Sequence, residues 1–126
     1  MALSESLEDY LEAIFEIERR KQIVRVRDVA QELGVTMPSV NGALKILEEK
    51  GYINHEKYEY IELTADGAAQ ASRISKRHLT IQAFLEKVLG VDRSTAETEA
   101  CKIEHDISPL TMKKMADFLD KYIDTE

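Results

Sequence analysis

The chain has 126 residues, of which 44% are hydrophobic and 33% charged, with a formal net charge of −7. This composition is typical of one globular domain or two small lobes, and it excludes a disordered chain. The single cysteine excludes an intrachain disulfide and fits a reducing cytoplasm. No apolar stretch approaches the roughly 20 residues that cross a bilayer, and the first residues lack a signal-peptide pattern, so we expect no membrane partner.

The charge is distributed unevenly along the chain. Residues 1–18 contain six acids and no base, whereas residues 19–50 contain seven bases against four acids. A basic segment between acidic ones is compatible with phosphate binding on one face, which the overall charge conceals. The clustered acids are either solvated surface or oxygen ligands of a cation.

A first helix is predicted from about Ser4 to Arg20. Ser4 can cap its open amide groups, and an apolar stripe recurs at helical spacing. Asp9 and Glu12 are three residues apart and therefore share another face of this helix. The stripe consists of Leu7, Leu11, Ile14 and Phe15.

A helix-turn-helix is predicted next. A short helix over 26–33 is ended by Gly34, where left-handed geometry is needed. Thr36 caps the following helix, Pro38 is tolerated in its first turn, and the apolar repeat continues to Lys50. Two helices joined by such a short turn form this motif.

Residues 52–63 change period and are rich in aromatic and β-branched side chains, which predicts a small hairpin with His55 exposed at its tip. A helix-turn-helix followed by a hairpin is a winged helix. The predicted fold is therefore mainly α with a small β wing, in which a winged helix-turn-helix DNA-binding domain precedes an all-helical dimerisation domain.

The second half is predicted to be helical. A long helix should cover 64–89, a second should run from Asp92 or Ser94 to about Ile107, and the last starts at Ser108. Short helices with this much apolar surface often complete their core against a symmetric partner, so we expect a homodimer. The expected domains are residues 1–70 and residues 71–126.

Three residues with metal-binding side chains share one helical face. Cys101, Glu104 and His105 stand at i, i+3 and i+4, so a thiol, a carboxylate and an imidazole converge. Their mixed soft and hard character suits a divalent first-row metal better than calcium. The alternative is a structural cysteine beside a surface Glu–His pair.

Further donors are available on other helices. His78 lies in the long helix, and Asp9 and Glu12 lie in the first. Each alone is compatible with packing or solvent exposure. Together with the cluster around residue 101 they would provide the roughly four to six ligands of a metal site.

The sequence contains no recognisable catalytic motif. A Gly-rich phosphate cradle, a CxxC pair, HExxH and a Ser/His/Asp arrangement are all missing from it. We therefore predict that the protein is not an enzyme, has no catalytic residue and takes no small-molecule substrate.

Four motifs in order resemble the diphtheria toxin repressor family of metal-dependent transcriptional repressors. They occupy residues 8–14, 35–40, 76–78 and 99–105, and the resemblance covers nearly the whole chain. The chain looks most like the short, two-domain manganese transport regulators. The resemblance implies a cytoplasmic homodimer in which a divalent metal links the first helix to the dimerisation domain and favours binding to double-stranded operator DNA.

The resemblance also implies a metal site of hybrid character. The implied first-helix carboxylates are of the manganese type, whereas the Cys-x-x-Glu-His ligands are of the iron type and replace a glutamate of the manganese type. Glu97 stands where the iron type has an ancillary histidine, which makes it a candidate ancillary ligand. The expected metal is Mn²⁺ or Fe²⁺, with Zn²⁺ or Co²⁺ binding in vitro. The implied ligands are Asp9, Glu12, His78, Cys101, Glu104 and His105.

For DNA, the start of the third helix is expected to enter the major groove. Gly42 stands where the iron type has a base-contacting glutamine, so operator preference does not transfer. Basic residues neutralise phosphates and set affinity rather than sequence choice. The expected groove residues are Thr36, Pro38, Ser39 and Asn41, and the expected phosphate contacts are Arg25, Arg27 and Lys45.

The sequence therefore predicts a metal-dependent repressor that controls metal-ion homeostasis. The main alternative is a metal-independent winged-helix regulator whose acids and cysteine are structural. A third class is a protein-interaction module that uses the winged helix as a scaffold.

Overall fold

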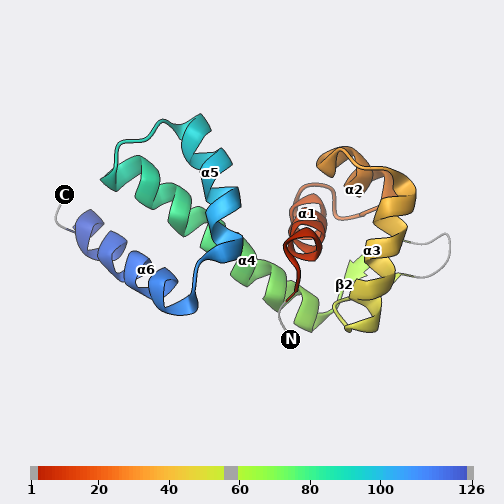
Figure 1. Cartoon of the computed structure of the whole chain (residues 1–126). Coiled ribbons are helices and arrows are strands. Elements are labelled where there is room, and N and C mark those ends of the chain that lie inside the picture. Colours follow the sequence, from red (N-terminus) through yellow and green to blue (C-terminus); the bar gives the residue numbers. More distant parts are fainter. Residues whose placement is uncertain (1–2, 56–59, 125–126) are drawn as a thin grey trace. The chain divides into compact units, whose positions relative to one another are not determined.

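The computed structural model describes residues 3–55 and 60–124, and its helices and small sheet confirm the predicted fold class (Figure 1). The chain divides into a first unit, Met1–Arg73, and a second unit, Ile74–Glu126. Among the described helices, none combines the length and apolar character that would let it cross a bilayer. The elements are α1 (Glu5–Lys21), α2 (Val26–Leu33), α3 (Met37–Glu49), β1 (Ile53–His55), β2 (Ile61–Leu63), α4 (Ala65–Ala83), the π-helix η1 (Phe84–Val88), α5 (Arg93–Asp106) and α6 (Pro109–Asp124).

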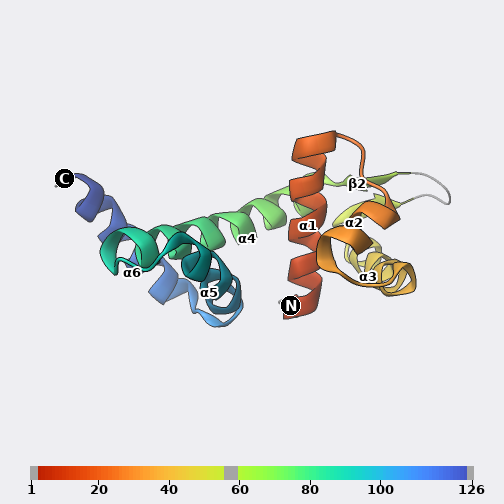
Figure 2. The same ribbon diagram turned by 90° about the horizontal axis from the view of Figure 1, so that it is seen from above.

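The first unit is a helix-turn-helix packed on α1. Gly34 ends α2 in the left-handed region with φ 66°, and the Thr36 hydroxyl accepts a 3.2 Å hydrogen bond from the Ser39 N–H to begin α3. Figure 2 shows α2 and α3 beside α1. Their shared core contains the fully buried side chains of Leu11, Ile14, Ile17, Val29, Leu44 and Leu47.

The wing is an antiparallel pair in which Ile53 lies opposite Leu63. A bridge that the sequence pattern did not predict joins it to the segment before α2, because the Ile61 N–H donates to the Val24 carbonyl at 2.9 Å. The expectation for His55 was wrong: it lies in β1, half-buried, and its N–H donates to Glu48 Oε2 at 3.1 Å. The rest of the predicted tip lies outside the described residues.

The start of α4 is fixed against the wing. Thr64 donates from its hydroxyl to the Gly51 carbonyl at 2.7 Å and from its N–H to the Tyr52 carbonyl at 3.0 Å. The same hydroxyl accepts from the Gly67 N–H at 3.0 Å. Gly67 packs so closely that a Cβ atom there would overlap the Tyr52 carbonyl oxygen and lie 2.8 Å from its carbon.

The second unit places α5 and α6 beside the end of α4 (Figure 1). Its core is formed by Ile81, Leu85, Ala96 and Ala100. The predicted uninterrupted helix over 64–89 was wrong at its end, because η1 replaces its last turns and the Leu89 N–H reaches back to the Phe84 carbonyl at 3.3 Å. Phe84 then meets Phe118 of α6 edge to face, with ring centroids 5.9 Å apart.

Asp28 ties α2 to the end of α1. Burial raises the pKa of its carboxyl, but the Lys21 ammonium at 3.1 Å and the Arg25 N–H at 3.0 Å outweigh that effect and lower the pKa below its ordinary value. A lowered folded-state pKa stabilises the fold above the unfolded-state pKa of about 3.9, and this contribution is lost as the pH falls through the folded-state value.

We therefore expect Asp28→Ala to lower the free energy of unfolding by about 1 kcal/mol at pH 7, through loss of the helix cap. Urea unfolding of both proteins at pH 7, 5 and 3 checks this. The difference should persist at pH 5 and shrink at pH 3, and an equal difference at all three values would contradict the linkage.

Candidate metal centre and nucleic-acid interface

Three of the predicted metal ligands converge in the second unit. His78 is presented by α4, and Cys101 and Glu104 are presented by α5 one turn apart. The His78 Nδ1 atom lies 2.9 Å from Glu104 Oε1 and 3.6 Å from Cys101 Sγ. One donor atom from each residue lies within 4.8 Å of the others, so a single ion can be reached by all three. We call this set the α4–α5 donor group.

The buried carboxylate of Glu104 gives the donor group its chemical character. Its side chain is 1% exposed, and its Oε2 atom is buried with no hydrogen-bond partner among the described residues. A buried polar atom without a partner is unfavourable by about 1–3 kcal/mol, more when charged. A cation satisfies such an atom, and the thiol, imidazole and carboxylate together fit a divalent first-row metal.

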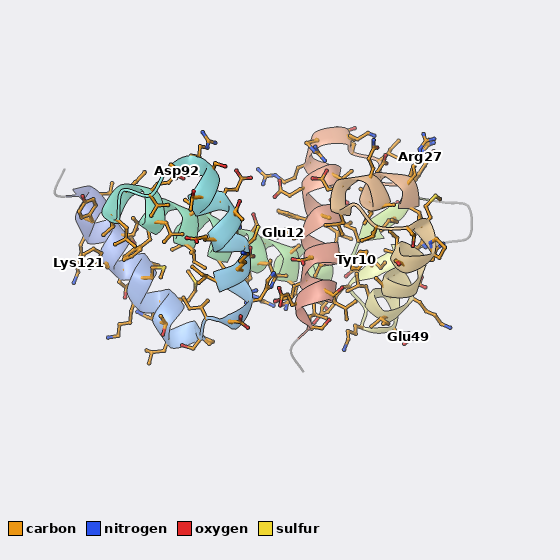
Figure 3. All side chains as sticks on the ribbon, turned by 45° about the horizontal axis from the view of Figure 1, so that its top comes forward. Tyr10, Glu12, Arg27, Glu49, Asp92 and Lys121 are labelled. Atoms are coloured by element: carbon orange, nitrogen blue, oxygen red, sulfur yellow. The ribbon has the colours of Figure 1, made fainter. Side chains whose placement is uncertain are left out.

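The other predicted ligands lie elsewhere on the described chain. His105 follows Glu104 on α5 and is half-buried, but it is not part of the α4–α5 donor group. Glu97 is exposed on α5, also outside this group. Asp9 and Glu12 are half-buried on α1, in the first unit, where Figure 3 shows Glu12. The structure therefore groups three of the residues, and the participation of the others stays a prediction.

The predicted groove residues form an exposed face of α3. Val40, Leu44 and Leu47 are buried on the core side, which leaves the opposite side of the helix to solvent. Thr36 and Ser39 are also used structurally, since their hydroxyls lie 3.0 Å apart at the start of the helix. The exposed residues of this face that we predicted to contact DNA are Pro38, Ser39, Asn41 and Lys45, with Thr36 just before the helix.

The predicted phosphate contacts Arg25 and Arg27 are both exposed at the start of α2, where Figure 3 labels Arg27. The Arg25 guanidinium lies over the Tyr60 ring, 5.3 Å from its centroid. Sequence analysis missed Tyr60, because only the bridge between Val24 and Ile61 brings the two neighbouring residues together. This stacking holds an exposed cation beside the wing.

Comparison with known families assigns both units. Residues 2–61 match the model of the iron dependent repressor N-terminal DNA binding domain. Residues 64–124 match the iron dependent repressor metal binding and dimerisation domain. Together the two models cover almost the whole chain.

Individual relatives agree with these matches. An HTH-type transcriptional regulator of Methanocaldococcus jannaschii, described as uncharacterized, is 37% identical over 123 residues, which cover 97% of this chain and 98% of the relative. The HTH-type transcriptional regulator MntR of Lysinibacillus sphaericus is 32% identical over 114 residues, covering 90% and 81%.

Solved structures resemble the chain over most of its length. The manganese regulator SloR matches with a TM-score of 0.79 at 27% identity, and the metal-dependent transcriptional regulator MtsR with 0.83 at 28%. These matches cover 95% and 90% of this chain, which spans about half of each solved chain, 55% and 53%. The sequence motifs, the fold and the matched models agree, and the chain belongs to the iron-dependent repressor family, which is the diphtheria toxin repressor family.

Proposed function

We propose that the protein is a metal-dependent DNA-binding transcriptional repressor that controls metal-ion homeostasis. The observation that carries this proposal is the α4–α5 donor group, in which the buried Glu104 carboxylate leaves one oxygen without a partner among the described residues. The family models support a chain that binds both DNA and metal. They favour this function over a metal-independent winged-helix regulator.

Six side chains would hold the metal. His78, Cys101 and Glu104 supply an imidazole, a thiolate and a carboxylate from the second unit. His105 adds a second imidazole on the same helix, and the α1 carboxylates of Asp9 and Glu12 complete the ligand set. When bound, the ion supplies positive charge that offsets repulsion among these acids. The arrangement in which α1 approaches α5 is then favoured, because the ion binds it preferentially.

DNA binding is assigned to residues 1–70, and metal binding and dimerisation to residues 71–126. The exposed face of α3 would enter the major groove of operator DNA, with Arg25, Arg27 and Lys45 on phosphates. Large apolar side chains of the second unit are exposed, Leu79 by 58% and Phe118 by 50%, and a second copy of the chain would cover them in a homodimer. A thiol ligand fits the reducing cytoplasm.

Electrophoretic mobility and anisotropy measurements on duplex DNA test the coupling. With Mn²⁺ or Fe²⁺ the wild type should bind a duplex selected from a random pool at least tenfold more tightly than with a chelator, which corresponds to ~1.4 kcal/mol. Glu12→Gln should abolish this stimulation while leaving the melting temperature of the metal-free protein unchanged. Equal binding with metal and chelator would indicate the metal-independent regulator, and no salt-dependent binding at all would indicate a protein-interaction module.

The metal itself is Mn²⁺ or Fe²⁺. Manganese is named for MntR and SloR, and the carboxylates of this chain favour that hard ion. Cys101 provides a soft ligand in the α4–α5 donor group, and it favours Fe²⁺ and, in vitro, Zn²⁺ or Co²⁺. Glu97, exposed on α5, is the candidate ancillary ligand.

The thiolate should therefore separate the metals. We expect Cys101→Ser to weaken Zn²⁺ and Co²⁺ binding at least tenfold and Mn²⁺ binding much less, because a hydroxyl replaces the soft donor. Competition with a chromophoric chelator measures the affinities, and the thiolate-to-cobalt absorption band should disappear in the variant. Equal losses for all metals, with that band retained, would remove Cys101 from the site.

A further inference from the structure

Four of the five glycines have a structural reason visible in the fold. Gly34, Gly51 and Gly90 adopt positive φ values of 66°, 81° and 73°, which favour glycine over any L side chain. Gly67 packs against the Tyr52 backbone, where a Cβ atom would overlap the carbonyl oxygen. The fifth, Gly42, has neither property.

Gly42 lies in the interior of α3, five residues after the helix begins at Met37. A Cβ atom at this position would meet nothing within 4 Å, so packing does not require its absence. Glycine in a helix interior is destabilising relative to alanine, because the unfolded chain has more freedom to lose. The fold alone therefore favours alanine at this position, and a requirement outside the monomer has to explain the glycine.

The surroundings of Gly42 identify that requirement. Pro38 and Lys45 stand one turn before and after it on the exposed side of α3, and Asn41 is adjacent. Asparagine can pair with adenine, proline can touch a thymine methyl, and lysine can reach a guanine edge or a phosphate. A side chain in the middle of this face would be the first atom to meet the groove floor.

We infer that Gly42 is a specificity-determining position at which the bare backbone of α3 closely approaches base edges in the major groove of DNA. This inference rests on the proposed function, since it presupposes that α3 reads DNA. The groove is about 12 Å wide and a helix with its side chains is about 10–12 Å across, so one added side chain displaces the helix. Displacement moves Asn41 and Pro38 away from the bases, while flexible lysines still reach phosphates.

The test combines a stability and a binding measurement on Gly42→Ala and Gly42→Leu. Alanine should raise the melting temperature of the metal-free protein by about 2–6 °C, because helix propensity improves where space is open. On a duplex selected from a random pool by the metal-loaded wild type, alanine should weaken binding about fivefold and leucine about a hundredfold. On an unselected duplex of the same length, both variants should bind within about twofold of the wild type.

Ala69→Leu is the matched control, because it enlarges an exposed helical residue of α4 in the same unit. It should leave binding to the selected duplex within about twofold. Selected binding by both Gly42 variants at wild-type strength would overturn the inference, as would a lower melting temperature of Gly42→Ala or an equal loss on both duplexes. If the wild type enriches no sequence from the pool, the proposed function itself fails, which is a separate result.

Discussion

Glu104→Gln is expected to abolish tight metal binding while the protein stays folded. The substitution keeps the size of the side chain and an oxygen that can accept from His78, whose Nδ1 lies 2.9 Å from Glu104 Oε1. It removes the negative charge of a 1% exposed carboxylate whose second oxygen has no partner among the described residues. Loss of an outer-shell partner typically weakens metal binding 10–100-fold, so loss of this direct ligand should exceed about 100-fold.

Isothermal titration with Mn²⁺ and with Co²⁺ measures the loss, and circular dichroism melting of the metal-free proteins monitors the fold. Glu99→Gln is the control, because it removes an exposed acid from the same helix. The control should bind metal as the wild type does. If Glu104→Gln binds both metals within a few-fold of the wild type, the α4–α5 donor group is a structural hydrogen-bond cluster rather than a metal site.

The mainly α fold with a small wing was predictable because local signals and burial agree. Ser4, Thr36 and Asp92 each cap the helix expected after them, and Gly34 ends α2 as predicted. The apolar stripe of α1 was right at Leu11 and Ile14, which are fully buried, whereas the more weakly patterned ends of the helix are only partly covered. Helical periodicity identifies the inward face well near the middle of a helix.

Features that depend on contacts between distant residues were not predictable. The π-helix at Phe84 reflects packing of that ring on Phe118, and nothing in the local spacing distinguishes it from an α-helix. His55 was placed in a turn because its neighbours are polar, but Glu48 on α3 accepts its N–H and extends the strand. The last helix was expected to turn Phe118 inward, yet this side chain is 50% exposed.

The candidate site was predictable in part for the same physical reason. Cys101 and Glu104 share a helical face, which spacing alone establishes. His78 lies 23 residues before Cys101 in the chain, and only the packing of α4 against α5 brings its ring to within 3.6 Å of the thiol. Its place in the group was therefore implied by family resemblance rather than by any local pattern.

Gly67→Ala is expected to destabilise the first unit by about 2–4 kcal/mol, although alanine is the better helix former. A Cβ atom there would overlap the Tyr52 carbonyl oxygen, and backbone on both sides has to move to relieve the overlap. The same carbonyl accepts the Thr64 N–H at 3.0 Å, and the Thr64 hydroxyl caps α4 through the Gly67 N–H at 3.0 Å. Any shift therefore weakens the junction between the wing and α4 as well.

Urea unfolding followed by circular dichroism measures the effect, and Gly42→Ala is the matched control because it makes the same change in a helix with open space around it. The two substitutions should move the free energy of unfolding in opposite directions, since propensity acts alone at one position and is outweighed by overlap at the other. Stabilisation by both would show that the backbone of Tyr52 yields without cost. In that case Gly67 would not be needed to seat α4 against the wing, and the junction would tolerate a side chain.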